Sequence, residues 1–489
     1  MGAASKFFRS ISPSVALAVG TITFATVSLL PNGLRWPTRA LFFLSLIVLL
    51  GHLVRGLHRS KTNPRAWLFT GIALALGLAV AYGVGEVGAA VLLKLRPDLG
   101  TAPLELTEPQ RASLTRSLED TTSYIQYDPE LGWSVRPNAR SEDGLAQSNA
   151  LGCRADREYA TEVPEGSFRI LTFGDSYTHC NEVANPDTWQ VAAESARPDL
   201  EVVNGGVGGY GVTQSLLRCR SGMQHLKTHV VILGCMTDDL RRSLNAYYPF
   251  RFDNPRQAPS ASGLPFSTLD RDGKLQIHPN PLGSQERMRQ LLDDPTTLLP
   301  ELAQLEPLYT PARATPLTDL LAHQWPVMEE KLSPLTAALK TRWDILCNRR
   351  SSPSRRAPRA PSIYEPGHPV FEVNAQLFQT FAQEVREAGL HPVVLWFPNP
   401  KDLAKMVENR DTPIYSRYLT RLQEAGIEVH DVLDWIREDA APHTPADVAA
   451  LYSGGHFSPA ANRIIGHRIA RMPWIPPHEA GFKQTPTPE

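Results

Sequence analysis

The sequence has few cysteines and almost no net charge. The first feature argues against a cysteine-based metal site, and the second argues against nucleic acid as a partner. The 489 residues contain five cysteines, an odd number, so at least one thiol has no partner within the chain. No two of them are spaced Cys-x-x-Cys, so the cysteines do not predict a metal site. We expect no cofactor. The formal net charge is −1 at pH 7. A nearly neutral chain gives no reason to expect nucleic acid as a partner.

The small net charge hides an uneven distribution. The first 100 residues hold ten Lys or Arg residues and only two acidic residues, Glu86 and Asp98. Three apolar segments lie in the same region, at 14–30, 40–54 and 66–93. The first two are near the lower limit for crossing a hydrocarbon core of about 30 Å, while the third is long enough to cross with tilt. The pattern predicts a membrane region over 1–94 with three transmembrane helices, or two if a short segment does not cross.

Basic residues also predict the orientation of this region. They crowd the loop 55–65 and precede the first segment at Lys6 and Arg9, and such residues are typical of cytoplasmic sides. Three spans would then place everything after residue 93 outside the cytoplasm, in a periplasmic or extracellular position. A cleaved signal peptide is the alternative for the first segment, but no small-x-small cleavage site follows it before the next apolar segment.

The stretch 168–178 reads Phe-Arg-Ile-Leu-Thr-Phe-Gly-Asp-Ser-Tyr-Thr and organises the rest of the chain. Its first half is an apolar run of strand length, and Gly174 breaks it, which predicts a buried strand followed by a tight turn that contains Ser176. A following helix is indicated by Asn185 as N-cap, with Pro186 at its first position. Because ligands bind at the carboxyl ends of strands in doubly wound sheets, Ser176 is a candidate nucleophile. The alternative is that Asp175 and Ser176 only satisfy backbone donors of the turn.

Three further short stretches accompany this one in a fixed order. They are Asn-Gly-Gly-Val-Gly-Gly-Tyr at 204–210, Gly-Cys-Met-Thr-Asp-Asp-Leu at 234–240 and His-Phe-Ser-Pro at 456–459. Together with Gly-Asp-Ser they resemble the four blocks of the SGNH (GDSL-type) hydrolases, over roughly 127–472. The order and spacing of the blocks are more specific than any single block.

The remaining pattern agrees with an α/β fold. Apolar runs at 168–173, 201–203, 229–233, 391–397 and 427–430 alternate with helical patterns at 212–226, 371–388, 412–426 and 458–471. Five strands alternating with helices predict a doubly wound, flavodoxin-like, five-stranded parallel sheet. We expect a tether with one short helix at 95–126, a domain at 127–473 with an insertion at 243–365, and a tail at 474–489. Residues 127–154 are expected to form a hairpin segment that covers the sheet edge.

The resemblance implies roles for particular residues. Ser176 would attack the acyl carbon, His456 would act as its general base, and the N–H groups of Ser176 and Gly209 would bind the oxyanion. Three other histidines are weaker candidates for the base. His179 is on the same turn as Ser176 and is poorly placed to reach back, and His443 and His467 have no motif context.

Two positions depart from the pattern of these hydrolases. The usual Asn of the third block falls on Asp238 or Thr237, and an ionised Asp238 would oppose the negative charge of an oxyanion. The usual Asp three residues before the histidine is replaced by Ser453. The imidazole would need another orienting group, and a backbone carbonyl or a carboxylate on another loop could supply it. A Ser-His dyad is also compatible with activity. The candidate carboxylates are Asp431, Asp434 and Asp447.

All five cysteines lie in the part of the chain predicted to be external, where disulfides can persist. Cys180 follows the nucleophile turn, and Cys153 occupies a position where sequences resembling this one tend to carry other residues. A disulfide between Cys153 and Cys180 is therefore one possibility, and two small buried thiols are the other.

These observations predict a membrane-anchored serine esterase that acts on a carbohydrate or lipid ester through an acyl-enzyme. Two alternatives use the same fold. One is a glycan O-acyltransferase, and the other is a non-catalytic binding or assembly protein of the cell envelope with a degenerate site. The expected partners are an ester-bearing glycan or lipid and the lipids of the membrane.

Overall fold

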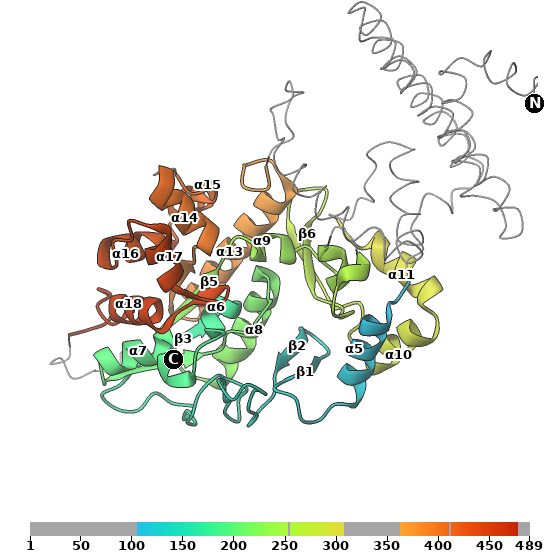
Figure 1. Cartoon of the computed structure of the whole chain (residues 1–489), viewed down its shortest axis with the longest axis horizontal. Helices are drawn as coiled ribbons and strands as arrows, with labels where there is room; N and C mark the ends of the chain where they lie inside the picture. The colour runs from blue at the N-terminus through green and yellow to red at the C-terminus, as the bar shows by residue number, and fades with distance from the viewer. Residues whose placement is uncertain (1–104, 253–254, 308–361, 410–411, 478–489) are drawn as a thin grey trace, which may run out of the picture. The chain divides into compact units, whose positions relative to one another are not determined.

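The computed structural model describes residues 105–252, 255–307, 362–409 and 412–477 (Figure 1). The three apolar segments predicted to cross a membrane, at 14–30, 40–54 and 66–93, lie outside these ranges. Among the helices within the ranges, none combines the length and the hydropathy that a membrane span requires.

A five-stranded parallel sheet is the centre of the fold. Its order is β4-β3-β5-β8-β9. The chain forms β3 first, adds the edge strand β4 on one side of it, and then adds β5, β8 and β9 in turn on the other side. This is the flavodoxin-like order predicted from the alternation of strands and helices. The strands are β3 (Phe168–Phe173), β4 (Leu200–Asn204), β5 (Val230–Cys235), β8 (His391–Trp396) and β9 (Glu428–Asp431).

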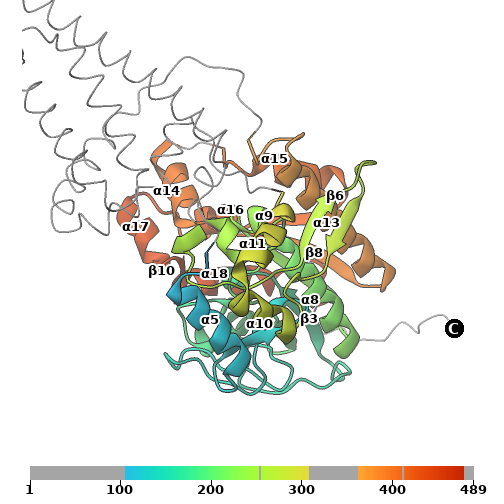
Figure 2. The ribbon, with the colours of Figure 1, turned by 90° about the vertical axis from the view of Figure 1, so that its right-hand side faces the viewer.

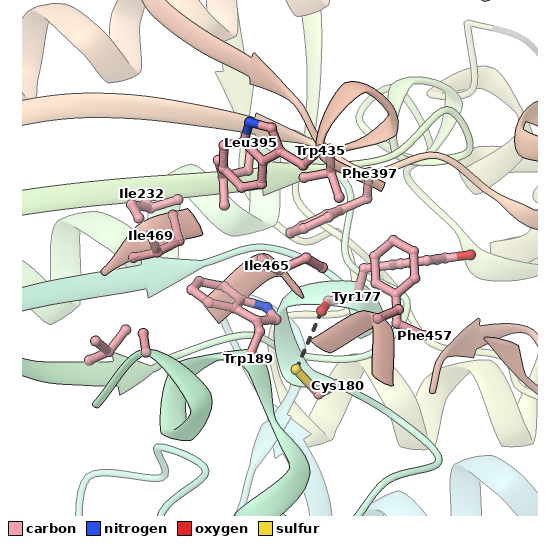
Figure 3. Packing of buried hydrophobic residues seen from close by; sticks show 14 of the residues in the cluster. Tyr177, Cys180, Trp189, Ile232, Leu395, Phe397, Trp435, Phe457, Ile465 and Ile469 are labelled. Carbon is pink, nitrogen blue, oxygen red and sulfur yellow. Dashed lines mark hydrogen bonds between the residues drawn. The ribbon is translucent and has the colours of Figure 1, made fainter. Parts of the chain in front are cut away.

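Helices cover both faces of the sheet because alternate strand residues are apolar on both sides. One face packs against α7 (Trp189–Ala196), α16 (Val432–Asp439) and α18 (Pro459–Ile469), with Trp189, Ile232 and Leu395 among the buried side chains (Figure 3). The other face packs against α8 (Val212–His225), α13 (Pro369–Glu387) and α15 (Ser416–Glu424). Strands β3 and β5 are buried at every position, as central parallel strands between two helical layers should be.

Additional elements surround the sheet, and Figure 2 shows α5, α10 and α11 together from a second direction. The ones before the sheet and inside the expected insertion are α5 (Glu108–Glu119), the hairpin β1 (Ile125–Asp128) and β2 (Gly132–Val135), the hairpin β6 (Phe266–Leu269) and β7 (Leu275–His278), α10 (Gln285–Asp293) and α11 (Pro295–Gln304). The remaining elements are α6 (Ser176–His179), α9 (Asp239–Arg242), α14 (Pro400–Asn409), α17 (Pro445–Ala450), β10 (Tyr452–Ser453), β11 (His456–Phe457), η3 (Asn185–Asp187), η4 (Tyr248–Arg251) and η5 (Pro255–Gln257).

Two helix starts differ from the sequence prediction. Asn185 does not cap α7, because residues 185–187 form the 3-10 turn η3 and Thr188 occupies the cap, where its side chain accepts from Val191 N. The Asn185 side chain instead accepts a hydrogen bond from buried Arg154 at 2.8 Å. The helix predicted at 412–426 begins at Ser416, and α14 precedes it over residues for which no helix was predicted. At the first place, the Asn185 side chain makes a tertiary contact and does not cap the helix. At the second place, Pro413 belongs to a turn before the helix, in which its carbonyl accepts from Ser416 N at 3.0 Å.

The one short helix expected at 95–126 is present, but it is bound to the domain. Gln110 of α5 donates to the carbonyl oxygens of Pro255 at 2.7 Å and of Ala258 at 3.3 Å, and Arg111 donates to that of Leu292 at 2.8 Å. The following hairpin β1–β2 packs through Val135 against the glycine-rich turn after β4. The described part of this segment therefore forms a wall beside one end of the sheet.

Candidate active site

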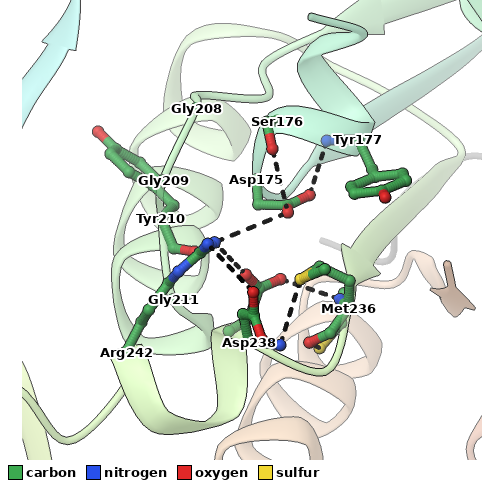
Figure 4. A network of polar contacts seen from close by, with 12 residues as sticks. Asp175, Ser176, Tyr177, Gly208, Gly209, Tyr210, Gly211, Met236, Asp238 and Arg242 are labelled. Atoms are coloured by element: carbon green, nitrogen blue, oxygen red, sulfur yellow. Dashed lines mark hydrogen bonds and ion pairs between the residues drawn. The ribbon is translucent and has the colours of Figure 1, made fainter. Parts of the chain in front are cut away.

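Three loops meet at the carboxyl ends of neighbouring strands and form the candidate site. They follow β3, β4 and β5, which are adjacent in the sheet. The parallel arrangement of these strands is therefore sufficient to bring residues from three of the predicted blocks together. Figure 4 shows Ser176, Gly209 and Asp238, one from each of these loops, in one view. The fourth block contributes His456 from a short hairpin, β10–β11, that precedes α18.

The structure places His456 against Ser176. Ser176 is the first residue of α6 and is buried, with 8% of its surface exposed. His456 Nε2 lies 2.7 Å from Ser176 Oγ, within hydrogen-bond distance. Tyr177 supports this geometry because its hydroxyl donates to the carbonyl of Gly455 at 2.8 Å, next to the histidine. A serine hydroxyl in contact with a neutral imidazole nitrogen is the arrangement that removes the serine proton during attack.

Glu182 lies on the other side of the imidazole. Its Oε1 is 3.3 Å from His456 Nδ1, and its Oε2 accepts a hydrogen bond from Gly455 N at 3.0 Å. Within the described residues Nδ1 therefore has a charged neighbour but no hydrogen-bond partner. Glu182 has φ of 69°, a left-handed conformation that costs a non-glycine residue about 1 kcal/mol or more and often occurs at functional sites.

The three carboxylates expected to orient the histidine are occupied elsewhere. Asp431 caps α16 and accepts from Tyr415 Oη at 3.1 Å, Asp434 pairs with Arg437 at 3.0 Å, and Asp447 caps α17. No contact of these carboxylates with His456 occurs among the described residues, so this expectation was wrong. Helix N-termini compete for aspartates, and two of the three serve as caps. No sequence motif includes Glu182, and its only signal is its position six residues after Ser176.

The turn that contains Gly209 is held by its carbonyl groups. Trp133 Nε1 donates to the carbonyl of Gly208, and Arg251 Nη1 donates to that of Gly209, each at 3.0 Å. Gly209 has φ of 80°, which favours glycine. In the described part of the chain, the N–H groups of Ser176 and Gly209 have no acceptor. Two backbone donors are therefore free in the turns of Ser176 and Gly209, and these turns are close together, since a Cβ built on Gly208 would lie 3.9 Å from Ser176 Cβ. Free donors of this kind are what an oxyanion site requires.

The third block turns Asp238 outward. Its side chain is 68% exposed and lies 3.9 Å from Arg242, and it makes no contact with Ser176 or Gly209 in the described residues. The neighbouring Asp239 is the buried carboxylate, and it accepts from Met236 N at 3.0 Å. Thr237, the other candidate for the Asn position, is buried and accepts from Asn399 Nδ2 at 3.1 Å. Among the described residues, neither side chain makes a hydrogen bond to Ser176 or Gly209.

Arg242 joins the three loops below the nucleophile (Figure 4). It pairs with Asp239 at 2.7 Å, lies 3.9 Å from Asp175, and donates to the carbonyl of Tyr210 at 3.3 Å. Burial raises the pKa of Asp175 and that of Asp239, while the guanidinium opposes the rise. One cation thus compensates two buried carboxylates and fixes the turn that carries Ser176.

The other histidines do not reach the nucleophile. His179 is buried, with Nε2 2.9 Å from Tyr124 Oη and Nδ1 2.8 Å from Asn181 Oδ1. Burial lowers the pKa of His179 to about 3, so its ring is neutral at ordinary pH. His443 and His467 are exposed, on other parts of the surface. Groups of three or more side chains that could hold a metal are absent from the described ranges.

The possible disulfide between Cys153 and Cys180 is not formed. Both thiols are free and buried, and they belong to the hydrophobic cores on opposite faces of the sheet. Cys180 Sγ lies 3.4 Å from Gln190 Oε1 (Figure 3 labels this cysteine). The alternative of two small buried thiols describes them correctly.

Comparison with known proteins gives weak likenesses only. No family model matches the sequence, and no curated protein matches it significantly. Among solved structures, a member of the lipolytic G-D-S-L family from Veillonella parvula is 10% identical, with 62% of this chain and 96% of that chain covered and a TM-score of 0.27. A putative lipolytic G-D-S-L protein from Desulfitobacterium hafniense is 9% identical (62% and 99% covered, TM-score 0.28). A catalytic mutant of an acetylxylan esterase from Geobacillus stearothermophilus is 10% identical (64% and 99% covered, TM-score 0.30). At such TM-scores the activities of these proteins say nothing about this chain.

Proposed function

We propose that this chain is a serine ester hydrolase that works through an acyl-enzyme. The observation that carries the proposal is the 2.7 Å contact between Ser176 Oγ and His456 Nε2, made by two residues from opposite ends of the domain. Glu182 beside Nδ1 of the same ring and two free backbone donors beside the hydroxyl support it. If Ser176 served only packing, it would not need a histidine at its hydroxyl, a carboxylate beside that histidine and free backbone donors in the same site.

In the proposed mechanism, His456 Nε2 takes the proton of Ser176 as Oγ attacks the acyl carbon. The N–H groups of Ser176 and Gly209 bind the negative oxygen of the tetrahedral intermediate. The imidazolium is oriented and stabilised by the Glu182 carboxylate, and it then gives its proton to the leaving alcohol. Water attacks the acyl-enzyme by the reverse sequence of proton transfers and releases the acid.

Labelling with a fluorophosphonate probe tests the proposal directly, because the probe reacts with activated serines only. We expect the full chain to be labelled on Ser176 and to hydrolyse activated aryl acetates. Ser176→Ala and His456→Ala should each remove most of both signals and leave the thermal unfolding midpoint unchanged. An unlabelled chain without esterase activity would instead favour the binding or assembly protein with a degenerate site.

The domain is further proposed to be anchored in a membrane by residues 1–94 and to lie outside the cytoplasm. The support is the sequence alone, namely the three apolar segments and the basic loop 55–65. Reporter fusions after Arg35, Lys61 and Arg96 should report outside, inside and outside in turn. A cytoplasmic signal from the last fusion would overturn both the anchoring topology and the location.

Acyl transfer to a sugar hydroxyl is the second candidate reaction. The observation that favours it is a polar cleft beside Gly209, in which a hydroxyl-bearing acceptor could compete with water. Incubation with an aryl acetate and excess oligosaccharide separates the two reactions. Acetylated oligosaccharide as the main product would assign transfer, and free acetate as the main product would assign hydrolysis.

A further inference from the structure

A cleft of about 650 Å³ begins next to the candidate oxyanion site and extends away from it. Its inner end is formed by Gly208, Gly209, Asn181 and Glu182, and its far end by α5 and the loop at 260–262. The hairpin β1–β2 forms one wall between the two ends. This volume is in the range of about 300–1,000 Å³ that small-molecule sites occupy. An ester placed at Ser176 would therefore have room for one of its two halves in this cleft.

The cleft walls carry many hydroxyl and carboxylate groups. Three carboxylates, Asp120, Asp143 and Glu182, contribute to the lining, and serine hydroxyls come from several segments. An alkyl chain would remove water from these groups without replacing the hydrogen bonds that water makes, which is unfavourable. A ligand with many hydroxyls of its own can replace those bonds. The lining serines are Ser113, Ser117, Ser123, Ser141, Ser260 and Ser262.

Aromatic rings between the polar groups give the cleft flat apolar surfaces. Trp133 and Tyr248 both line it, with ring centroids 6.0 Å apart in an edge-to-face arrangement. The guanidinium of Arg251 lies 5.0 Å from the Tyr248 ring, and the Trp133 Nε1 bond to Gly208 fixes the indole. Fixed aromatic faces beside hydroxyl groups suit a sugar ring, which has apolar C–H faces and a polar rim.

Asn181 adds an oriented donor at the inner end. Its Oδ1 faces His179 Nδ1 at 2.8 Å, and the Tyr124 hydroxyl faces the other ring nitrogen at 2.9 Å. Because Asn181 Oδ1 can only accept, the neutral His179 ring carries its proton on Nδ1 and donates to Oδ1, and Nε2 then accepts from the Tyr124 hydroxyl. The Asn181 amide is thereby fixed with Nδ2 on its free side.

The free side of Asn181 is close to the nucleophile. A Cβ atom on Gly208 would lie 3.3 Å from Asn181 Nδ2 and 3.9 Å from Ser176 Cβ, so both groups border the same small space. Within the described residues Nδ2 has no acceptor. A side chain that is oriented by two buried partners and keeps an unused donor beside a substrate cleft is arranged to bind a ligand atom.

We propose that this cleft binds the sugar portion of a carbohydrate ester, with Asn181 donating to a sugar oxygen next to the ester bond. Tyr124 and His179 act as positioning residues for that donor. The inference rests on the proposed function for the ester chemistry, but the binding of sugar to the cleft can be measured without turnover.

Binding to the full chain with Ser176→Ala is the first test. We expect a panel of neutral oligosaccharides, titrated by calorimetry, to include members that bind. Ser117→Trp in the same background should abolish the binding, because the indole would fill the cleft from α5. Thr115→Trp, an exposed position two residues away on the same helix, is the matched control and should bind as before. No binding by any oligosaccharide, or equal binding by both tryptophan variants, would overturn the proposal.

Turnover with two substrates is the second test. Asn181→Leu should reduce kcat/KM for O-acetylated oligosaccharides about tenfold or more relative to kcat/KM for p-nitrophenyl acetate, since one hydrogen bond to the sugar is lost. Tyr124→Phe should reduce the same ratio in the same direction, whereas exposed Gln383→Leu on α13 should not change it.

An equal loss on both substrates would place Asn181 at the acyl group and overturn its role toward the sugar. Preference for long-chain acyl esters without sugar binding would assign the cleft to a lipid. Absence of activity on every ester, with sugar binding intact, would reject the hydrolase and leave the cleft assignment standing.

Discussion

Glu182 Oε1 lies 3.3 Å from His456 Nδ1, although no motif in the sequence pairs these residues. The carboxylate reaches the imidazole because the chain takes a left-handed conformation at Glu182 and because Gly455 N holds the second carboxylate oxygen at 3.0 Å. Glu182 thus occupies the place on the histidine that the sequence assigned to an aspartate from another loop.

Glu182→Gln should lower kcat on aryl acetates and leave the fold unchanged. The amide cannot stabilise an imidazolium as a carboxylate does, and the corresponding change in trypsin costs about 10⁴-fold. Glu182 is partly exposed, so water can compensate in part, and we expect a loss of about 10²-fold. Glu201→Gln, a carboxylate away from the site, is the control. Turnover of Glu182→Gln equal to that of the parent would reject the orienting role.

Gly454→Ala should reproduce much of that loss without removing the carboxylate. A Cβ on Gly454 would lie 2.3 Å from Glu182 Oε2, and the φ of 61° at this position also disfavours alanine. The neighbouring Gly455 has open space where its Cβ would be, so Gly455→Ala should retain activity. Steady-state kinetics of the two alanine variants, with melting curves for both, measure the difference. Equal activities would show that the position of Glu182 is unimportant.

Asp238→Asn should change turnover by less than about twofold at any pH from 5 to 9. The side chain is mostly exposed and makes no hydrogen bond to Ser176, so restoring the amide of the usual third-block residue adds no donor to the oxyanion site. The measurement is kcat against pH for the parent and the variant. A large increase at neutral pH would instead return Asp238 to the oxyanion site.

Arg242→Met should destabilise the fold strongly, and the loss should depend on pH. Removing one partner of a buried ion pair costs about 3–5 kcal/mol, and here two buried carboxylates lose their cation. Burial raises the pKa of Asp175 and Asp239 above their values in the unfolded chain, so the stability these groups contribute is present at low pH and lost as pH rises through the folded values. Denaturant unfolding should therefore show a smaller deficit at acidic pH than at neutral pH. A deficit that grows on acidification would contradict this.

His179 should make the folded chain sensitive to acid. Its pKa is lowered from 6.5 to about 3, so the unfolded chain takes up a proton below pH 6.5 that the folded chain refuses until about pH 3. Stability is therefore lost as pH falls through this window, by at most about 1.4 kcal/mol per pH unit for one proton. Replacement by phenylalanine should flatten the dependence, whereas the same change at exposed His225 should not. Parallel slopes for parent and His179→Phe would reject the assignment.

The sequence by itself determined the sheet and the pairing of Ser176 with His456. Strand Phe168–Phe173 has apolar residues on both faces, with Phe168 and Ile170 in one core and Leu171 and Phe173 in the other, as a strand covered on both faces requires. The alternation of such strands with amphipathic helices leaves few possible topologies. Motifs at strand ends then converge, because parallel strands bring their carboxyl ends to one edge of the sheet. The membrane topology of residues 1–94 remains a prediction from the sequence, since these residues lie outside the described ranges.

Only the tertiary structure decided which charged side chains serve the site. Asp238 and Asp239 are adjacent and chemically identical, but the fold exposes the side chain of Asp238 and buries that of Asp239 against Arg242. Asp431 and Asp447 matched the expected residue type but cap helices, while Glu182 reaches His456 through a left-handed turn. Cys153 and Cys180 are kept apart by the sheet itself. Burial patterns are local properties of the chain and can be read from periodicity, whereas the direction of a single carboxylate depends on contacts between segments distant in sequence.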